Sequence, residues 1–440
     1  MKARVRIGLA CLARDTFDFK AAKEIFDGKK SELLGMENVA WEIIPELVIS
    51  TEEAQAAAQN LATKDLDGLV ILSGTFHLGH LALIFDKVVN KPVLLWAFNE
   101  LPYDGGKIRL NSVCGINLNA SNLYKSGNTT FCSHISDDID ENWIDALRLK
   151  AAISRAHIGL AGYRAHGFFN LDVEDLTLFR RLGILIDHYE LSDVYKNTAP
   201  AEELQDEAVQ KDICTTYNCA GVSGQQVEKV AALAGAFKRF MDGNKLTALA
   251  VRCWPEFAAD FGIAPCAAMS YLQSKGYILG CEGDVEGTVS MLACKAISDL
   301  APFMADLSQV NFEEDYALMW HCGVASPSLW DEKSDLALDS YFAGGKGVTA
   351  DFVLKSGMVT LFRIDTALGK TRVFLQRGKA VPMEKQLKGT YAKVVFEQSV
   401  RDLFQTVADN GIAHHVAMVY GDFTTVFRKF ARLMGFEVIE

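Results

Sequence analysis

Two carboxylates and one imidazole in the last third of the chain have the types needed for metal chemistry. Glu282 lies in Gly-Cys-Glu-Gly-Asp, Asp306 ends Phe-Met-Ala-Asp, and His415 ends Ala-His-His. Such a hard, mostly oxygen-donating set suits Mn²⁺ or Mg²⁺. Three protein ligands leave coordination positions free for water or substrate oxygens, which is typical of a catalytic rather than a structural site. The sequence therefore indicates a divalent-metal site.

The segment around Glu282 also has a purely structural interpretation. A helix is predicted from Glu286 to Leu300, and an acid just before a helix often caps it. Asp284, two residues before this helix, fits the capping position better than Glu282 does. Asp306 follows after one helix and a turn, so both carboxylates can return to the same end of the fold.

Other polar side chains near these ligands each have two interpretations. His321 in Leu-Met-Trp-His-Cys-Gly is either a further ligand or a buried core histidine. His414 directly precedes His415, so on a strand the two would face opposite sides and only one could reach a metal. Arg252, which ends an apolar strand, either holds an oxyanion or a hydroxyl group or pairs with Glu256.

The composition excludes several classes of protein. The chain has 440 residues, 50% of them hydrophobic and 23% charged, so two or three globular domains are expected. The net charge of −12, without clusters of Lys and Arg, argues against nucleic-acid binding. The sequence contains no apolar run of about 20 residues that could span a membrane. Charges in the opening Met-Lys-Ala-Arg-Val-Arg do not fit a signal peptide, so a cytoplasmic protein is expected.

The ten cysteines include no Cys-x-x-Cys pair and lie mostly in apolar or helical patterns. Buried free thiols in a reducing compartment are the expected state. Zinc fingers and disulfide frameworks are therefore set aside.

Residues 1–155 are expected to form an N-terminal α/β domain. Strands are predicted at Arg4–Cys11, Val39–Val48, Leu66–Ser73 and Lys91–Phe98, with helices at Thr51–Thr63 and His80–Val89. Strands that alternate with helices predict a doubly wound parallel sheet. In such sheets ligands meet the loops after the strand ends, which here contain His77 and Asn99.

A second α/β domain is expected over residues 156–310, because Ala156-His-Ile-Gly-Leu-Ala echoes the first strand. Its predicted elements are Asp172–Leu182, Ile184–Tyr189, Gly224–Met241, Leu246–Arg252, Ala264–Lys275 and Tyr277–Gly280. The last of these strands would deliver Glu282 to a strand end.

Residues 311–440 are β-prone. Strands are predicted at Tyr316–Trp320, Val348–Phe352, Met358–Asp365, Thr371–Gln376 and Tyr391–Phe396, and helices at Glu397–Asn410 and Phe423–Met434. The expected fold class is therefore α/β: two doubly wound, Rossmann-like domains followed by a β-rich, barrel-like C-terminal domain.

An ordered set of motifs resembles the L-fucose isomerase and L-arabinose isomerase superfamily. It comprises Gly-Cys-Glu-Gly-Asp, Pro-Phe-Met-Ala-Asp, Tyr-Phe-Ala-Gly-Gly-Lys-Gly at 341–347, Val-Thr-Leu-Phe-Arg-Ile-Asp at 359–365 and Ile-Ala-His-His. Gly-Leu-Val-Ile-Leu-Ser-Gly-Thr-Phe-His at 68–77 matches the first domain of this family in style. The resemblance extends over essentially the whole chain.

The resemblance implies a residue-by-residue assignment. The metal carboxylates of the family fall on Glu282 and Asp306, and its late metal histidine falls on His415. Arabinose isomerases have another metal histidine where His321 stands, whereas fucose isomerases do not rely on it. Ala305 stands where arabinose isomerases carry Glu, which brings the chain closer to the fucose type.

The implied activity is metal-dependent aldose–ketose isomerisation of a small sugar through a metal-chelated enediolate, with Mn²⁺ or Mg²⁺ as cofactor. Glu282 and Asp306 would act as base and acid as well as ligands, and a hydride shift is the alternative route. Substrate contacts are expected from Arg252, Trp254, His77 and Asn99. The family implies a homo-oligomer, such as a hexamer, whose first domain reaches the site of a neighbouring subunit.

Two alternatives remain open from the sequence. The first is an isomerase of a modified or charged sugar such as sulfoquinovose, with Arg164 and His166 either contacting the anion or lying in a solvated loop. The second belongs to another class, a non-catalytic sugar-binding or regulatory module, because two α/β domains around a cleft also describe sugar-binding proteins.

Overall fold

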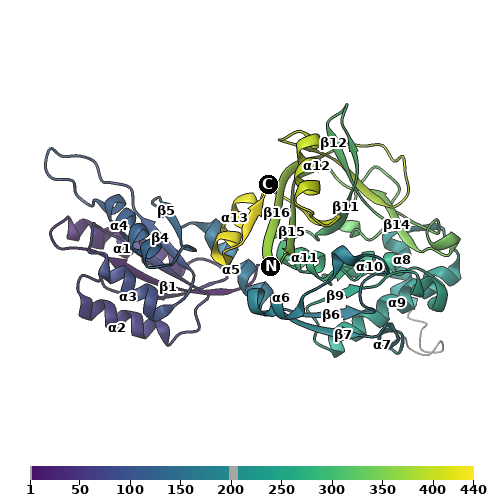
Figure 1. Ribbon diagram of the computed structural model, residues 1–440, viewed down its shortest axis with the longest axis horizontal. Coiled ribbons are helices and arrows are strands. Elements are labelled where there is room, and N and C mark those ends of the chain that lie inside the picture. Colours follow the sequence, from purple (N-terminus) through teal and green to yellow (C-terminus); the bar gives the residue numbers. More distant parts are fainter. Residues whose placement is uncertain (1, 198–206) are drawn as a thin grey trace. The chain divides into compact units, whose positions relative to one another are not determined.

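The computed structural model describes residues 2–197 and 207–440. The chain divides into two compact units, unit 1 with Met1–Ala151 and Thr425–Phe436, and unit 2 with Ala152–Thr424 and Glu437–Glu440. Figure 1 traces their helices and strands along the chain. The division into domains 1–155, 156–310 and 311–440 stays a prediction.

Unit 1 contains a five-stranded, fully parallel sheet in the order β2-β1-β3-β4-β5. Its strands are β1 (Val5–Leu12), β2 (Val39–Ile43), β3 (Gly68–Ser73), β4 (Val93–Ala97) and β5 (Cys132–Ile135). Its helices are α1 (Phe19–Leu34), α2 (Thr51–Ala62), α3 (His80–Val89), α4 (Ser112–Lys125), α5 (Glu141–Ser154) and α13 (Thr424–Met434). The predicted doubly wound sheet is confirmed as a parallel α/β sheet, with β2 shorter than expected.

The sequence explains why this sheet forms. Every residue of β3 and β4 is buried, as expected for parallel strands covered by helices on both faces. Helix α2 begins with a capping box, in which Ser50 accepts from the amide of Glu53 and Glu53 reaches back to the amide of Ser50. The apolar sides of α2 and α3 pack against the strands in one core cluster.

Unit 2 contains a second parallel sheet, in the order β10-β9-β6-β7. Its strands are β6 (His157–Ala161), β7 (Leu185–Tyr189), β9 (Ala248–Val251) and β10 (Leu279–Gly280). The helices of this part are α6 (Asp175–Leu182), α7 (Leu191–Tyr195), α8 (Glu207–Thr216), α9 (Gly224–Gly243), α10 (Cys266–Ser274) and α11 (Val285–Ile297). The second predicted α/β sheet is therefore confirmed.

Unit 2 also contains a ten-stranded mixed sheet in the order β19-β16-β15-β18-β11-β12-β17-β14-β13-β8, with an additional pairing of β16 with β17. Its strands are β8 (Asn218–Gly221), β11 (Phe303–Asn311), β12 (Tyr316–His321), β13 (Ala337–Asp339), β14 (Thr349–Val353), β15 (Gly357–Ala367), β16 (Lys370–Val381), β17 (Thr390–Phe396), β18 (His415–Tyr420) and β19 (Glu437–Ile439). Helix α12 (Val400–Asp409) lies between β17 and β18 in the chain. The β-rich character expected after residue 310 is confirmed.

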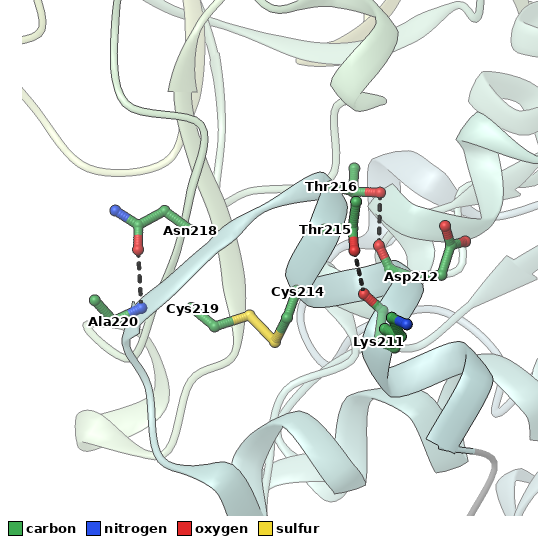
Figure 2. The surroundings of a disulfide bond; sticks show 8 residues. All are labelled: Lys211, Asp212, Cys214, Thr215, Thr216, Asn218, Cys219 and Ala220. Atoms are coloured by element: carbon green, nitrogen blue, oxygen red, sulfur yellow. Dashed lines mark hydrogen bonds between the residues drawn. A yellow bond between two sulfur atoms is a disulfide. The ribbon is translucent and has the colours of Figure 1, made fainter.

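The cysteines differ from the expectation in one place. Cys214 at the end of α8 and Cys219 in β8 form a disulfide bond, as Figure 2 shows. Directly after Cys219, Ala220 donates its amide to the side chain of Asn218 at 3.0 Å. The other eight cysteines are free thiols and all but Cys114 are buried. The prediction of free thiols is thus wrong for this pair, which a five-residue separation without a Cys-x-x-Cys pattern did not indicate.

In the described part of the chain, no helix is long and apolar enough to cross a membrane.

Candidate metal centre

Strand pairing brings the three predicted metal ligands to one end of unit 2. Glu282 follows β10, Asp306 lies in β11, and His415 is the first residue of β18. Strands β11 and β18 are antiparallel, with Asp306 directly opposite His415. Residues opposite one another on neighbouring strands present their side chains on the same face. The register of this pair therefore sets the carboxylate beside the imidazole.

The backbone at Glu282 makes a tight turn that presents its side chain. Glu282 and Gly283 both have left-handed φ angles, of 60° and 73°, and such a conformation is costly for a residue with a side chain. The turn is held by two hydrogen bonds, from Gly283 N to Val251 O at 3.0 Å and from Ala165 N to Glu282 O at 2.9 Å. A Cβ on residue 283 would collide with the carbonyl group of Tyr163, so glycine is required there.

The ligand atoms converge on the imidazole of His415. Its Nε2 lies 3.4 Å from Glu282 Oε2 and 3.3 Å from Asp306 Oδ1. Among the described residues, neither His415 Nε2 nor Asp306 Oδ1 has a hydrogen-bond partner, although both atoms are buried. Buried polar atoms without partners are rare because their desolvation costs free energy. These two atoms are placed as they would be around a shared cation.

The tautomer of His415 is fixed by Asp284. His415 Nδ1 lies 3.0 Å from Asp284 Oδ2, and because an ionised carboxylate can only accept, the imidazole donates this hydrogen bond. Nε2 therefore keeps its lone pair on the side of Glu282 and Asp306. A carboxylate that orients a metal-binding imidazole in this way is the usual second layer of a metal site.

Asp284 is itself held by a buried arginine. Arg363 in β15 is 0% exposed and donates to both oxygens of Asp284, from Nη1 at 2.7 Å and from Nη2 at 3.3 Å. Asp284 also caps α11, as predicted, by accepting from Gly287 N at 2.8 Å. Burial alone would raise the pKa of Asp284, but Arg363 and His415 outweigh it and hold the pKa far below its ordinary value. The carboxylate is therefore ionised.

The electrostatics of the centre attract a cation. Burial favours the neutral form of Glu282, yet the hydrogen bond of His414 and the charge of His415 hold the pKa of this carboxyl below its ordinary value. Burial also opposes a charge on His415, but Asp284, Asp306 and Glu282 raise the pKa of this imidazole above its ordinary value. The same carboxylates that favour a proton on His415 favour a metal ion in its place. Glu282, Asp306 and His415 thus fit a hard divalent ion in position and in chemistry.

The adjacent histidines correct one expectation. His414 lies just before β18 rather than within it, so strand alternation does not separate the two rings, whose centroids are 4.2 Å apart. His414 Nε2 reaches the same oxygen, Glu282 Oε2, at 3.5 Å. Its Nδ1 faces the side-chain amide nitrogen of Asn170 at 3.2 Å and accepts from it. His414 therefore carries its proton on Nε2 and donates to Glu282, whereas His415 presents a lone pair.

His321 ends β12, as the apolar pattern predicted, and is 3% exposed. Its ring lies near that of His415, with centroids 5.5 Å apart and an interplanar angle of 25°. Ligand atoms of Asp306, His321 and His415 lie within 4.8 Å of one another. Burial lowers the pKa of His321, which favours the neutral ring. Its position alone does not decide whether His321 is a metal ligand.

Two further expected substrate contacts, Trp254 and Arg252, lie in unit 2 and have different hydrogen-bond partners. Trp254 donates from Nε1 to Glu282 Oε1 at 3.1 Å, and its ring meets Phe168 edge to face at 5.9 Å. Arg252 forms the alternative salt bridge to Glu256, with Nη2 to Oε1 at 2.8 Å. Trp254 therefore lies directly beside a predicted ligand, while Arg252 is already paired with a carboxylate.

His77 and Asn99 lie in unit 1, after β3 and β4. His77 is fully buried, with Nδ1 2.9 Å from Thr75 O and Nε2 2.8 Å from Asn119 Nδ2. The side chain of Asn99 is exposed. Both ring nitrogens of His77 are thus engaged within its own unit, and a substrate role for either residue stays a prediction.

Sequence reasoning missed three contributors to the centre: Arg363, His414 as a donor to Glu282, and Asn170. The signal for Arg363 was present, since an arginine inside the apolar strand Val-Thr-Leu-Phe-Arg-Ile-Asp must find a carboxylate when it is buried. His414 and Asn170 are far apart in sequence, and no local pattern joins them.

Comparisons with known proteins identify the family of the chain. The family described as "Fucose/sulfoquinovose isomerase, N-terminal domain" matches residues 8–161, and the family described as "L-fucose isomerase, C-terminal domain" matches residues 328–440. The chain therefore belongs to the fucose isomerase family. It is an enzyme of the aldose–ketose isomerase class, so a non-catalytic module is no longer supported.

The similar curated proteins have the same printed name, "Sulfoquinovose isomerase". Those of Priestia aryabhattai and Priestia megaterium (strain ATCC 12872 / QMB1551) are each 28% identical over 440 residues, covering 97% of this chain and 97% of the relative. That of Alkalicoccus urumqiensis is 26% identical over 408 residues, covering 90% of both chains.

One solved structure with some similarity is an ABC transporter solute-binding protein from Agrobacterium vitis bound with alpha-D-tagatopyranose. It is 14% identical and covers 58% of this chain and 79% of its own, with a TM-score of 0.16. A similarity of this size carries no argument about the fold of the present chain.

Glu286 next to the centre gives a prediction about stability and pH. Burial raises the pKa of Glu286 to about 8, although Arg363 lies 3.8 Å away and opposes the shift. The folded protein then keeps a proton that the unfolded chain releases near the ordinary pKa of 4.5, so stability falls as the pH rises between these values. Glu286→Gln lacks this titration. The free energy of unfolding is measured by urea denaturation in chelator. The variant should become more stable relative to wild type as the pH rises from about 4.5 to 8.

The control for this experiment is Glu313→Gln, which alters an exposed carboxylate. Its difference from wild type should stay constant with pH. A difference that stays equally constant for Glu286→Gln would contradict the raised pKa.

The opposite tautomers of the adjacent histidines give a second prediction. His415→Ala removes a lone pair from the centre and should abolish Mn²⁺ binding. His414→Ala removes only a donor to Glu282, so Mn²⁺ affinity should fall by roughly 10–100-fold at most. Equilibrium dialysis of Mn²⁺ against both purified variants measures the difference. Equal losses would contradict the different roles of the two rings, and loss only in His414→Ala would show that they have been assigned the wrong way round.

Proposed function

We propose that this protein isomerises sulfoquinovose to the corresponding ketose with the help of a divalent metal ion, Mn²⁺ or Mg²⁺. The observation that carries the proposal is the convergence of Glu282, Asp306 and the lone-pair nitrogen of His415 at 3.3–3.4 Å. The sulfonated sugar is favoured over a generic small aldose because the relatives that match along nearly the whole chain are named for it.

Glu282, Asp306 and His415 would hold the ion. When bound, such an ion acts as a Lewis acid that polarises a carbonyl group and stabilises developing negative charge on oxygen. Asp284 and Arg363 keep His415 oriented, and Trp254 keeps Glu282 in place through its indole N–H.

The chain's own carboxylates supply the proton chemistry. Isomerisation moves a hydrogen between C1 and C2 and a proton between the two oxygens, which requires a base and an acid. The depressed pKa of Glu282 keeps it ionised and ready to accept a proton. Asp306, whose Oδ1 would face the ion beside His415, is the candidate for the second proton carrier. Phe168 and Trp254 add aromatic faces beside these groups.

The proposal extends to the shape of the C-terminal sheet and to the assembly. Because β16 pairs with both β15 and β17, the pairings β16-β15-β18-β11-β12-β17 return to their start, which supports a barrel.

The proposal also includes a cytoplasmic homo-oligomer, such as a hexamer. It further includes substrate contacts from Arg252, His77 and Asn99.

The substrate assignment is tested with purified protein and four aldoses. With Mn²⁺, NMR should detect a ketose from sulfoquinovose, and little from D-glucose, which has the same sugar skeleton without the sulfonate. L-fucose and L-arabinose test the generic small-sugar alternative. A chelator should abolish turnover and Mn²⁺ should restore it. Full activity in chelator would refute metal dependence, and faster turnover of L-fucose would refute the sulfonated substrate.

The double role of Glu282 is tested with Glu282→Gln, which keeps the size of the side chain but removes its charge. Metal affinity and turnover should fall together, because one group is both ligand and proton carrier. Mn²⁺ titration and ketose assays at saturating Mn²⁺ separate the two effects. Near-normal turnover would leave Glu282 with a structural role only.

A further inference from the structure

His321 is the third imidazole of the centre, and its position does not say whether it binds the metal ion. It ends β12 and lies with Asp306 and His415 in a group whose ligand atoms are within 4.8 Å. The deciding question is which of its two nitrogens carries the hydrogen, because a metal ligand needs a free lone pair.

The main chain answers this question. The backbone amide of Cys322 donates to His321 Nδ1 at 2.8 Å. A backbone N–H is only a donor, so Nδ1 must present its lone pair to it. The thiol of Cys322 also approaches Nδ1, at 3.1 Å. The hydrogen of the neutral ring is therefore on Nε2.

The surroundings of Nδ1 hold this tautomer. Behind the ring lie buried cysteines, with the Cys322 sulfur 3.4 Å from that of Cys266. Thiols are weak donors and weak acceptors, so they compete poorly for an imidazole proton. The ring also lies parallel to that of Trp320, with centroids 6.3 Å apart and an interplanar angle of 7°.

His321 and His415 thus carry the ring hydrogen on opposite nitrogens. In His415 the nitrogen Nδ1 donates to Asp284, which leaves Nε2 with a lone pair. In His321 the nitrogen Nδ1 accepts, which leaves Nε2 with a hydrogen. This Nε2 is buried and has no hydrogen-bond partner among the described residues. A buried donor of this kind needs an acceptor that arrives with the ligand.

We propose that His321 is not a metal ligand but a hydrogen-bond donor of the centre, whose Nε2–H binds a sugar oxygen beside Asp306 and His415. The inference rests on the proposed function. It assigns to His321 the stabilisation of negative charge on that oxygen, in the manner of an oxyanion hole. The chain then uses one imidazole as ligand and two as donors, because His414 donates to Glu282.

The direct test counts the imidazole nitrogens bound to Mn²⁺ in the full-length protein by pulsed EPR, from their ¹⁴N couplings. Wild type should show one coordinated imidazole, and His321→Asn should show the same one. Asparagine is the matched variant because its carbonyl oxygen can take the place of Nδ1 and accept from Cys322 N, while it has no atom in the place of Nε2. Mn²⁺ affinity of this variant should fall by no more than about 10-fold, the lower end of the range for groups that surround a metal ion without binding it.

Catalysis provides a second readout that a structural role would not move. His321→Asn should lower kcat for the sugar on the order of 100-fold, and His321→Gln, whose amide N–H can reach the place of Nε2, should recover part of the loss. Metal content and kcat then separate a donor from a ligand.

Three outcomes would overturn the inference, and they have different meanings. Two coordinated imidazoles in wild type, with one lost in His321→Asn, would make His321 a ligand and leave the proposed function intact. A wild-type protein that binds no Mn²⁺ or Mg²⁺ would overturn both the inference and the metal-dependent function. Equal kcat in wild type and His321→Asn would also contradict the donor role.

Discussion

The candidate metal centre depends on the buried ion pair between Arg363 and Asp284. Arg363 is fully enclosed, and Asp284 accepts from it, from His415 and from the first turn of α11. Breaking a buried pair by removing one partner costs about 3–5 kcal/mol, because the remaining charge stays buried without compensation. One carboxylate therefore couples the start of a helix, the strand β15 and the orientation of a ligand. The orientation of His415 is thus set by an ion pair inside the buried core.

Local hydrogen bonds then divide three neighbouring imidazoles into different chemical species. Each has its Nδ1 occupied by a scaffold group, a carboxylate for His415, an amide side chain for His414 and a backbone N–H for His321. An acceptor at Nδ1 leaves a lone pair at Nε2, and a donor at Nδ1 leaves a hydrogen there. Residue type alone would make these three histidines equivalent. Their second nitrogen therefore differs: it carries a lone pair in His415 and a hydrogen in His414 and His321.

The sequence could predict what depends on local pattern. Alternating strands and helices gave both parallel sheets, the capping acid Asp284 was recognised from its place before α11, and the motifs pointed to Glu282, Asp306 and His415. It could not predict contacts between segments that are distant in the chain, such as Arg363 with Asp284 or Asn170 with His414. The separation of His414 from His415 was wrong because β18 starts one residue later than assumed. No pattern in the sequence indicated the disulfide bond between Cys214 and Cys219.

The centre combines several unfavourable features that a cation would relieve together. Glu282 has a left-handed backbone, which costs about 1–3 kcal/mol. Glu282 Oε2 and Asp306 Oδ1 both face the lone-pair nitrogen of His415 at 3.3–3.4 Å. These features persist because the turn at Gly283 and the Arg363–Asp284 pair fix their positions. A divalent cation at this place would face all three atoms, and binding to the folded chain alone would stabilise the fold. The same fixed positions that hold these three atoms together are what would suit a small, hard cation.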